Sequence, residues 1–383
     1  MMKRKLLLPL VIVITFIGGF LTGTVVTTHK NQDFSQPKIK NAPLSAIKPK
    51  LKDVPKIKTE PKKVLIGYVQ DFRNPNDVEY EKLTHVIFSF AHPTADGNIL
   101  LNGDTALNNL RATVKNANKY HTKVMLAIGG WYHIQGGESY PYFKEALATP
   151  TSRTNMVTQL TRLVDQEKLA GIDIDFEYPR STIEAKNLAA FSNELSHTLH
   201  LKGKELSVAV NSKINAANGS TISSVVYDTS MFQNVDHVNI MAYDGQWDGG
   251  YNAANLSTYP FAVNIVNYWT KLFDSIKLPK EKLVLGVPFY AQPENQAIKQ
   301  VSYAAIVHQN PANANSDIVK MNGTTYHYNG EITMKKKTKL ALEHGFGGVM
   351  MWEAGHDAKG PNSLTKTIFS VLNEASSQYA DAN

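Results

Sequence analysis

The sequence predicts an α/β protein, a TIM (β/α)8 barrel preceded by an N-terminal membrane or signal segment and a linker. Eight short apolar, β-rich runs occur after residue 63, and segments whose apolar residues recur at three- and four-residue spacing lie between them. This alternation is typical of βα units and a parallel sheet. A chain of 383 residues with 43% hydrophobic content is long enough for one barrel of about 250 residues and additional segments.

The runs and the segments between them give the expected elements in order. The expected strands are Val64–Val69, His85–Phe90, Lys123–Ile128, Gly171–Glu177, Leu206–Asn211, His237–Tyr243, Leu283–Pro288 and Gly348–Trp352. The expected helices are Thr105–Tyr120, Ser152–Lys168, Thr182–Leu201, Pro260–Ile276 and Thr333–His344. An open doubly wound sheet is the alternative, but it would need a Gly-rich phosphate-binding turn after the first strand, and residues 67–70 do not provide one. The long connection between strands seven and eight predicts a small insertion around residues 302–332.

The N-terminal segment precedes the first expected strand. Three basic residues lead into Leu6–Val26, an uncharged apolar run of 21 residues. Such a run can cross a bilayer and is longer than the roughly 7–15 apolar residues of a cleaved signal peptide. Residues 1–26 are therefore expected to be a signal peptide or, in better keeping with their length, an uncleaved anchor that leaves the rest of the chain at the cell surface or secreted. Residues 27–63 interleave Lys with Pro, as an extended linker does, followed by the barrel over residues 64–375 and a tail over residues 376–383.

The net charge of +7 is concentrated before the barrel. Residues 3–5 contribute +3 and residues 27–63 contribute +7, so the remainder of the chain carries a net charge of −3. Nucleic-acid binding is therefore not expected, because no excess of positive charge remains on the folded part to contact phosphates. The chain has no cysteine, which excludes disulfides, thiolate catalysis and Cys-ligated zinc.

The fourth expected strand is strongly acidic. Asp173, Asp175 and Glu177 occupy every second position, so they share one face of the strand while the apolar residues between them share the other. Placing like charges this close together inside a barrel raises at least one pKa, which suits a general acid. The alternatives are an exposed edge strand with a polar face and a calcium site built from the two aspartates.

Four segments together resemble a known family. Residues 171–177 (Gly-Ile-Asp-Ile-Asp-Phe-Glu) resemble the strand-four signature Asp-Gly-x-Asp-x-Asp-x-Glu of glycoside hydrolase family 18, the chitinase family. Residues 127–131 (Ala-Ile-Gly-Gly-Trp) are similar to its strand-three motif, and residues 241–244 (Met-Ala-Tyr-Asp) are similar to its strand-six motif. Trp352 matches the aromatic residue that ends strand eight. The similarity extends over about residues 64–375.

The resemblance implies hydrolysis of β-1,4-linked N-acetylglucosamine polymers by a retaining, substrate-assisted mechanism. Glu177 would protonate the glycosidic oxygen, and Asp175 would orient the acetamido group of the substrate. Asp173 would share a proton with Asp175. Tyr243 would donate a hydrogen bond to the acetamido oxygen, and Asp244 would bind near the same sugar.

Further substrate-binding residues are implied by the family motifs and by positions at strand ends. Trp131, Trp247 and Trp352 are expected to stack on sugar rings, whereas Trp269 lies in the middle of a helix and is expected in the core. The full expected substrate-binding set is Tyr68, Phe90, Gly130, Trp131, Tyr178, Met241, Asp244, Trp247 and Trp352.

Several positions depart from the family pattern. Ala170 replaces the first Asp, Phe176 replaces a Trp, and residues 291–292 (Ala-Gln) replace a Gly-Arg pair. Ala127 replaces a Ser whose hydroxyl, together with that of Tyr68, supports the innermost acid in the family. The hydroxyl of Tyr68 is therefore expected to support Asp173 alone. These departures concern substrate class and pH profile rather than reaction type.

Other functions on the same fold remain open from the sequence. One is a sugar-binding lectin without catalysis, although a lectin has no need of an acid at position 177. Others are an endo-β-N-acetylglucosaminidase and a peptidoglycan N-acetylglucosaminidase. The expected partners are a polysaccharide or oligosaccharide containing N-acetylglucosamine and, through the N-terminal segment, a membrane, and the chain is expected to be a monomer. No cofactor or metal is expected, because His237, His356 and Asp357 do not show a short ligand spacing.

Overall fold

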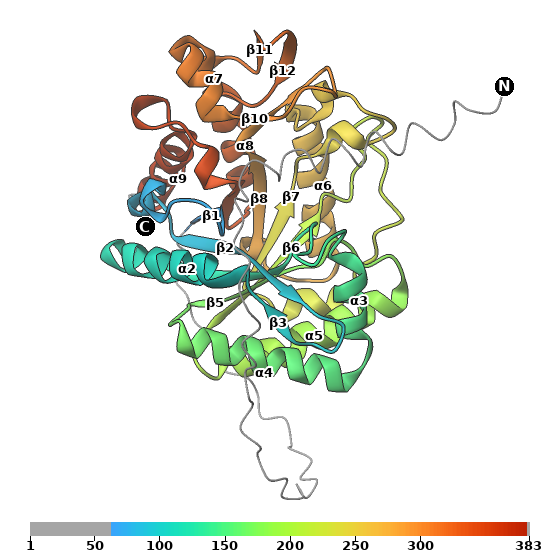
Figure 1. Ribbon diagram of the computed structural model, residues 1–383. Coiled ribbons are helices and arrows are strands. Elements are labelled where there is room, and N and C mark those ends of the chain that lie inside the picture. The colour runs from blue at the N-terminus through green and yellow to red at the C-terminus, as the bar shows by residue number, and fades with distance from the viewer. Residues whose placement is uncertain (1–62, 381–383) are drawn as a thin grey trace, which may run out of the picture. The chain divides into compact units, whose positions relative to one another are not determined.

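The computed structural model describes residues 63–380, and the side chains as far as residue 374 (Figure 1). The expected membrane or signal segment over residues 1–26 and the linker as far as residue 62 lie outside the described residues. Within the described part, no helix has both the length and the apolar character needed to cross a bilayer.

Eight parallel strands form a closed barrel, which confirms the predicted TIM barrel (Figure 1). The hydrogen-bonded order is β1-β13-β8-β7-β6-β5-β4-β2, and β2 pairs again with β1 to close the circle. The barrel strands are β1 (Val64–Gln70), β2 (His85–Pro93), β4 (Lys123–Gly129), β5 (Gly171–Asp175), β6 (Glu205–Asn211), β7 (His237–Met241), β8 (Leu283–Pro288) and β13 (Gly348–Trp352). A short strand, β3 (Ile99–Leu100), pairs antiparallel with the end of β2.

Helices surround the barrel and cover the outer faces of its strands (Figure 1). They are α2 (Gly103–Ala117), α3 (Tyr140–Ala148), α4 (Pro150–Gln166), α5 (Thr182–His200), α6 (Tyr259–Ser275), α7 (Tyr303–Gln309), α8 (Glu331–Glu343) and α9 (Leu364–Ala380). The five expected helices are present within a few residues of their predicted bounds. Helices α3, α7 and α9 were not expected, and α9 continues past residue 375, where the barrel was expected to end.

The insertion between strands β8 and β13 is a small subdomain of its own. It contains an antiparallel sheet in the order β10-β9-β12-β11 together with α7 (Figure 1). The strands of this sheet are β9 (Tyr290–Pro293), β10 (Val301–Ser302), β11 (Ile318–Met321) and β12 (Thr324–His327). The insertion therefore begins directly after β8, earlier than residue 302, because β9 turns away from the barrel to pair with β12.

Two strands end earlier than the sequence indicates. The expected fourth strand continued to Glu177, but β5 ends at Asp175, and the expected sixth strand continued to Tyr243, but β7 ends at Met241. The parallel pairing of β5 with β6 stops at Ile174, so the following backbone leaves the sheet. Glu177 and Tyr243 therefore lie just beyond the C-terminal ends of their strands, where TIM barrels carry their active sites.

Alternation along the strands divides the buried residues between two cores. Ile172, Ile174 and Phe176 face outward and belong to the large core between the strands and the helices. The smaller core fills the barrel interior and contains Ile66, Tyr68, Ile87, Met125, Ala127 and Tyr243. The acidic face of β5 is thereby directed into the barrel.

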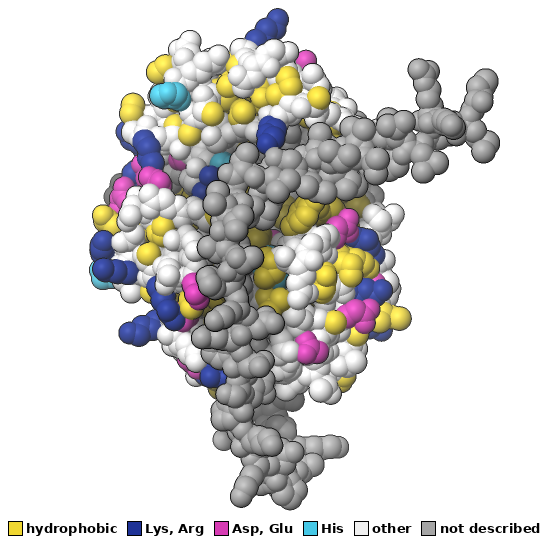
Figure 2. All heavy atoms as spheres, viewed as in Figure 1, with side chains coloured by type: hydrophobic (Ala, Val, Ile, Leu, Met, Phe, Trp, Pro, Cys, Tyr) yellow, Lys and Arg dark blue, Asp and Glu magenta, His cyan; other side chains and the backbone are white. Residues whose placement is uncertain are grey.

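The visible surface is of mixed charge. In Figure 2, basic and acidic side chains are interspersed over the described part of the molecule, and hydrophobic side chains gather over the insertion at the top of the view. Strand β11 of the insertion carries Ile318, whose side chain is exposed.

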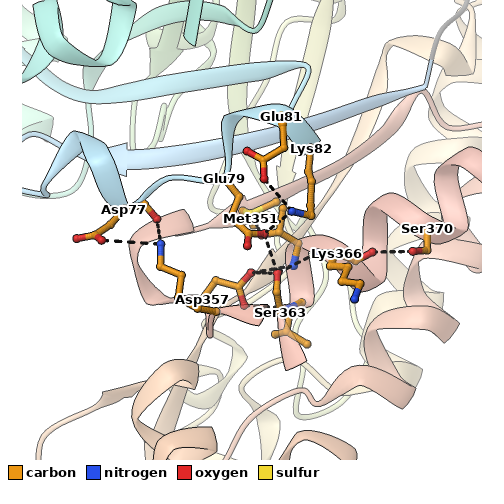
Figure 3. A network of polar contacts seen from close by, with 12 residues as sticks. Asp77, Glu79, Glu81, Lys82, Met351, Asp357, Ser363, Lys366 and Ser370 are labelled. Atoms are coloured by element: carbon orange, nitrogen blue, oxygen red, sulfur yellow. Dashed lines mark hydrogen bonds and ion pairs between the residues drawn. The ribbon is translucent and has the colours of Figure 1, made fainter. Parts of the chain in front are cut away.

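A partly buried carboxylate, that of Asp357, fixes the start of the last helix (Figure 3). Asp357 accepts hydrogen bonds from the backbone N–H groups of Leu364 and Thr365, both at 2.9 Å, and from the Ser363 hydroxyl at 2.8 Å. Ser363 also donates to Glu79, which links the helix to the loop after β1. Asp357, which could be considered a metal ligand from its position beside His356, is instead occupied in capping α9.

We predict that Asp357→Ala lowers the free energy of unfolding by about 1–3 kcal/mol, because it leaves buried N–H groups at a helix start without an acceptor. Urea denaturation followed by circular dichroism measures this change. The matched control is Asp77→Ala, since Asp77 is an exposed carboxylate whose contact with Lys359 is long, 3.9 Å, and its loss should leave stability close to wild type. Equal stability of the two variants would contradict the capping role.

Candidate active site

Three carboxyl groups line the C-terminal part of β5. Asp173 is fully buried, Asp175 is 3% exposed, and Glu177 lies two residues further on with part of its surface open to solvent. The spacing places the three groups in sequence from the barrel interior toward its C-terminal opening. The three expected catalytic acids are thus brought to one site.

Asp173, the innermost acid, receives hydrogen bonds from three other strands of the barrel. The Tyr68 hydroxyl on β1 donates to Oδ2 at 2.8 Å. On β6 the Ser207 hydroxyl donates to Oδ1 at 2.5 Å, and on β7 the Asn239 amide donates to the same oxygen at 3.2 Å and to the Tyr68 hydroxyl at 3.1 Å. Burial raises the pKa of Asp173 to about 6, although these three hydrogen bonds favour the carboxylate.

The expectation that one hydroxyl supports Asp173 is therefore wrong. Strands β4 and β6 flank β5, and their registers place Ala127 on one side of Asp173 and Ser207 on the other. Ala127 on β4 has no hydroxyl where the family pattern has a Ser, and Ser207 on β6 supplies a hydroxyl to Asp173 from the other side. Asn239 adds a third donor from β7, the next strand in the barrel.

Asp175 and Glu177 have environments that favour their protonated forms. Burial, together with the charges of Glu177 and Asp173, raises the pKa of Asp175 well above its usual range. Burial also raises the pKa of Glu177 to about 7, against a hydrogen bond from Tyr178 that lowers it and with the charge of Asp244 that raises it. A carboxyl group with this pKa can donate a proton near neutral pH.

Asp175 also has an oxygen available for a ligand. Its Oδ1 atom is buried and has no hydrogen-bond partner among the described residues. No hydrogen bond joins Asp173 to Asp175 within this part of the chain, so the expected sharing of a proton between them stays a prediction. A buried acceptor without a donor indicates a place where a ligand N–H group fits.

Tyr243 and Asp244 follow β7, which is separated from β5 by one strand, β6. The Tyr243 hydroxyl lies 3.9 Å from the Met350 sulfur, a weak acceptor that leaves the donor available to a ligand. Burial and the charge of Asp175 raise the pKa of Tyr243 well above its usual range, so the hydroxyl keeps its proton. Asp244 accepts hydrogen bonds from the Tyr290 hydroxyl at 2.6 Å and from Gln246 at 3.0 Å, which fix its carboxylate.

Aromatic side chains form the floor of the site. Trp352 ends β13, and its ring centroid lies 5.8 Å from that of Phe90, nearly parallel, and 5.7 Å from that of Tyr68. Gly130 is required beside this floor, because a Cβ atom there would lie 2.8 Å from the Phe90 ring. Gly130 also has a positive φ of 77° and donates its N–H to the Asp175 carbonyl at 2.9 Å.

The remaining expected substrate-binding residues lie further from the acids or at the solvent boundary. Trp131 and Trp247 are 48% and 59% exposed, and Trp247 packs against Tyr251 with ring centroids 4.9 Å apart. Tyr178 and Met241 are partly exposed. Exposed indole rings can stack on a sugar, and this role stays a prediction for both tryptophans. Trp269 is fully buried in α6, as expected of a core residue.

The structure adds residues that the sequence did not single out as functional. Ser207 and Asn239 contact Asp173, Tyr290 contacts Asp244, and Tyr227 is close enough to Asp175 and Glu177 for their charges to raise its pKa. Ser207 and Asn239 carried a usable signal, since both are polar residues at inward positions of apolar strands. Tyr227 carried none, because it lies in a loop whose path is set by tertiary packing.

His237 does not come together with His356 or Asp357, the two other residues considered as metal ligands, in any candidate metal group among the described residues. His356 lies 3.4 Å from Glu353 Oε1 behind Trp352. His237 lies with His85 and Glu205 at the opposite end of the barrel, and these three form the one group of His, Cys, Asp and Glu among the described residues with spacing suitable for a metal ion. The catalytic end contains no such group within the described residues.

Comparisons with known proteins agree with this arrangement. The family model described as Glycosyl hydrolases family 18 matches residues 64–357. Endochitinase 1 of Metarhizium robertsii is 25% identical over 351 residues, covering 78% of this chain and 81% of that protein. Probable chitinase 10 of Drosophila melanogaster is 30% identical over 241 residues, but this chain spans only 10% of that protein. The crystal structure of the GH18 chitinase ChiB from the chitin utilization locus of Flavobacterium johnsoniae has the same fold, with a TM-score of 0.67, 24% identity, and coverage of 82% of this chain and 95% of that chain.

We predict that Glu177→Gln stabilises the protein at neutral and alkaline pH. Because the folded-state pKa of Glu177 is raised, ionisation above the unfolded pKa disfavours the folded state, and this loss is complete above pH 7. The variant should exceed wild type by on the order of 1–3 kcal/mol at about pH 8 and match it at about pH 4.

Urea unfolding at both pH values measures the difference. Glu343→Gln, on the exposed side of α8, is the matched control and should show no such pH-dependent gain. A Glu177→Gln protein no more stable than wild type at the higher pH would show that Glu177 ionises without cost in the folded protein.

Proposed function

Because the chain belongs to glycoside hydrolase family 18, we propose that it hydrolyses β-1,4 glycosidic bonds of N-acetylglucosamine polymers, such as chitin, by a retaining, substrate-assisted mechanism. The observation that carries the proposal is the position of Glu177. Its pKa is raised to about 7, and it lies in the same site as the buried Asp175 and the Tyr243 hydroxyl. These groups can supply a proton donor, an orienting acceptor and a hydroxyl donor to one reacting sugar, and this combination supports the proposal.

In the first step Glu177 donates its proton to the glycosidic oxygen, and the bond between that oxygen and the anomeric carbon breaks. The carbonyl oxygen of the substrate's own acetamido group attacks the anomeric carbon from the other face and forms an oxazolinium ion. No protein nucleophile is needed. Asp175, the carboxyl group nearest to Glu177 along the chain, can then serve the acetamido group, with Asp173 behind it.

Asp175 supports the acetamido N–H. Its Oδ1 atom is the buried acceptor without a partner, so an N–H donor from the substrate satisfies it. As positive charge develops on the acetamido group, Asp175 passes its proton to Asp173, as the family resemblance implies, and the resulting carboxylate stabilises that charge in the low-dielectric interior. Among the described residues, the Tyr243 hydroxyl contacts only the weakly accepting Met350 sulfur, so it can donate to the acetamido oxygen and orient it for attack.

In the second step water opens the oxazolinium ion, and Glu177, now ionised, accepts the proton of that water. Two displacements at the anomeric carbon leave its configuration retained. Trp352, Phe90 and Tyr68 provide the apolar floor below this sugar. The exposed Trp131 and Trp247 extend the surface that a longer polymer can contact.

We predict that Glu177→Gln lowers kcat by about two to four orders of magnitude, because glutamine has no proton to donate. Steady-state rates on a chromogenic chitobioside measure this loss, and urea unfolding verifies that the variant is folded. Parallel product analysis on chitin oligomers, purified peptidoglycan and an N-glycoprotein distinguishes a chitinase from the two other hydrolases. A Glu177→Gln enzyme with near-wild-type rate would overturn the proposal.

The hydrogen bonds to Asp173 lead to a second kinetic prediction. Ser207→Ala should reduce kcat by roughly ten- to a hundredfold with little change in KM, because a hydrogen bond to a charged group contributes about 1.5–3 kcal/mol and each 1.4 kcal/mol is about tenfold in rate. Tyr68→Phe should act in the same direction. Ala127→Ser should restore part of the Ser207→Ala loss, since it places a hydroxyl on the other side of Asp173.

Ser192→Ala is the matched control for these variants. Ser192 is a buried serine of α5 whose hydroxyl donates only within its own helix, to the Leu188 carbonyl, and its loss should leave kcat unchanged. Additive losses for Ser207→Ala and Ala127→Ser, or an unaffected Ser207→Ala enzyme, would show that Asp173 does not depend on this hydroxyl.

The location of the enzyme is part of the proposal. The apolar run Leu6–Val26 followed by the Lys- and Pro-rich linker is the sequence feature that supports attachment to the outer face of a membrane. We predict that the mature protein remains in the membrane fraction with these residues present. N-terminal sequencing of the exported protein decides this, and a first residue near position 25 would show cleavage and release.

A further inference from the structure

Polar residues occupy the N-terminal end of the barrel interior, opposite the acidic site. His85, Lys123, Glu205 and His237 are the first residues of β2, β4, β6 and β7. Alternation along β6 and β7 points Glu205 and His237 inward, because Ser207 and Asn239, two residues later, point inward to Asp173. The interior of a TIM barrel is usually filled by layers of bulky apolar side chains, so a layer rich in His and Glu requires an explanation.

The contacts in this layer centre on Glu205. The His85 Nε2 atom lies 2.9 Å from Glu205 Oε2, and the Lys123 ammonium forms an ion pair with Oε1 of the same carboxylate. His85 Nδ1 lies 2.8 Å from the Thr84 hydroxyl, which fixes the ring orientation. The rings of His85 and His237 are nearly perpendicular, with centroids 5.3 Å apart.

The ion pairs of Glu205 with His85 and Lys123 do not account for the presence of His237 in this layer. The Nδ1 atom of His237 is buried and has no hydrogen-bond partner among the described residues. In the neutral tautomer that carries its proton on Nε2, the Nδ1 atom offers a lone pair that can bind a metal ion.

We propose that His85, Glu205 and His237 bind one divalent transition-metal ion, with zinc the best match, at the N-terminal end of the barrel. One ligand atom from each residue lies within 4.8 Å of the other two. Tetrahedral zinc with ligands at about 2.0–2.2 Å places them about 3.3 Å apart, so small side-chain rotations close the site. Two imidazole nitrogens and a carboxylate oxygen suit zinc, and a water completes the fourth position.

Thr84 and Lys123 have roles around such a site. A metal-bound His85 Nε2 leaves Nδ1–H to donate to the Thr84 hydroxyl, the outer hydrogen bond that zinc-bound histidines commonly make. Lys123 is the competing cation. Its side chain is 43% exposed, so it can turn toward solvent when the metal neutralises Glu205.

The proposed ion would link β2, β6 and β7 at the end of the barrel remote from Glu177. It would stabilise the fold by binding the folded chain and would not take part in glycoside hydrolysis. The inference therefore does not rest on the proposed function.

The test uses the purified full chain after chelator treatment, titrated with zinc chloride by isothermal calorimetry and followed by thermal melting. We expect one zinc ion per chain and a melting temperature that rises with zinc concentration. His237→Ala should weaken binding by at least about tenfold. His121→Ala is the matched control, because His121 is an exposed histidine at the same end of the barrel and should leave binding unchanged.

Lys123→Met separates the metal site from a purely structural ion pair. If the three residues bind zinc, removal of the competing cation should tighten binding, and cobalt titrated into this variant or into wild type should give the intense visible absorption of a tetrahedral site. If Glu205 serves only as a partner for Lys123, the variant should be less stable and indifferent to zinc. No saturable binding to wild type, or equal binding in His237→Ala, would overturn the proposal.

Discussion

The burial of three carboxyl groups along one face of β5 is the constraint on which the catalytic end of the barrel depends. Charged groups at this separation disfavour one another in a low-dielectric interior, and burial adds to the cost of ionising each of them. The barrel offsets the cost of ionisation to a different extent for each of the three carboxyl groups. Asp173 receives three hydrogen bonds from β1, β6 and β7. One oxygen of Asp175 has no donor within residues 63–374, and Glu177 is partly exposed to solvent. The inner acid, Asp173, is therefore stabilised as a carboxylate by hydrogen bonds, and the outer acid, Glu177, holds a proton near neutral pH.

The same strands supply both ends of the barrel interior. On β6, Ser207 contacts Asp173 and Glu205 contacts His85, and on β7, Asn239 contacts Asp173 while His237 lies beside His85. Inward positions two residues apart therefore serve an acidic site at one end and a histidine-rich layer at the other. Because the two layers are joined through rigid parallel strands, stability at the N-terminal end helps to hold the donors to Asp173 in register.

Features that depend on interactions between residues close in sequence could be predicted, and features that depend on residues distant in sequence could not. The barrel, its eight strands and the placement of Asp173, Asp175 and Glu177 on one face depend on local alternation, which is visible in the sequence. The donors to Asp173 depend on register between strands that are distant in sequence, so Ser207 could be recognised as polar and inward but not matched to its partner. Tyr227 and the early start of the insertion depend on loop packing and on the pairing of β9 with β12, which no local pattern encodes. The end of β5 at Asp175 could not be predicted either. The alternation of acidic and apolar residues continues to Glu177, whereas the backbone pairing of the strand stops earlier.

The configuration of the first product distinguishes a substrate-assisted reaction from one that inverts the anomeric carbon. Proton NMR spectra recorded during the first turnovers on a chitin oligomer distinguish the two anomers before they equilibrate. Retention through an acetamido intermediate predicts that the β-anomer is formed first and that oligomers with free amino groups in place of acetamido groups are not cleaved at those sugars. Initial formation of the α-anomer, or equal cleavage at sugars without the acetamido group, would contradict the account.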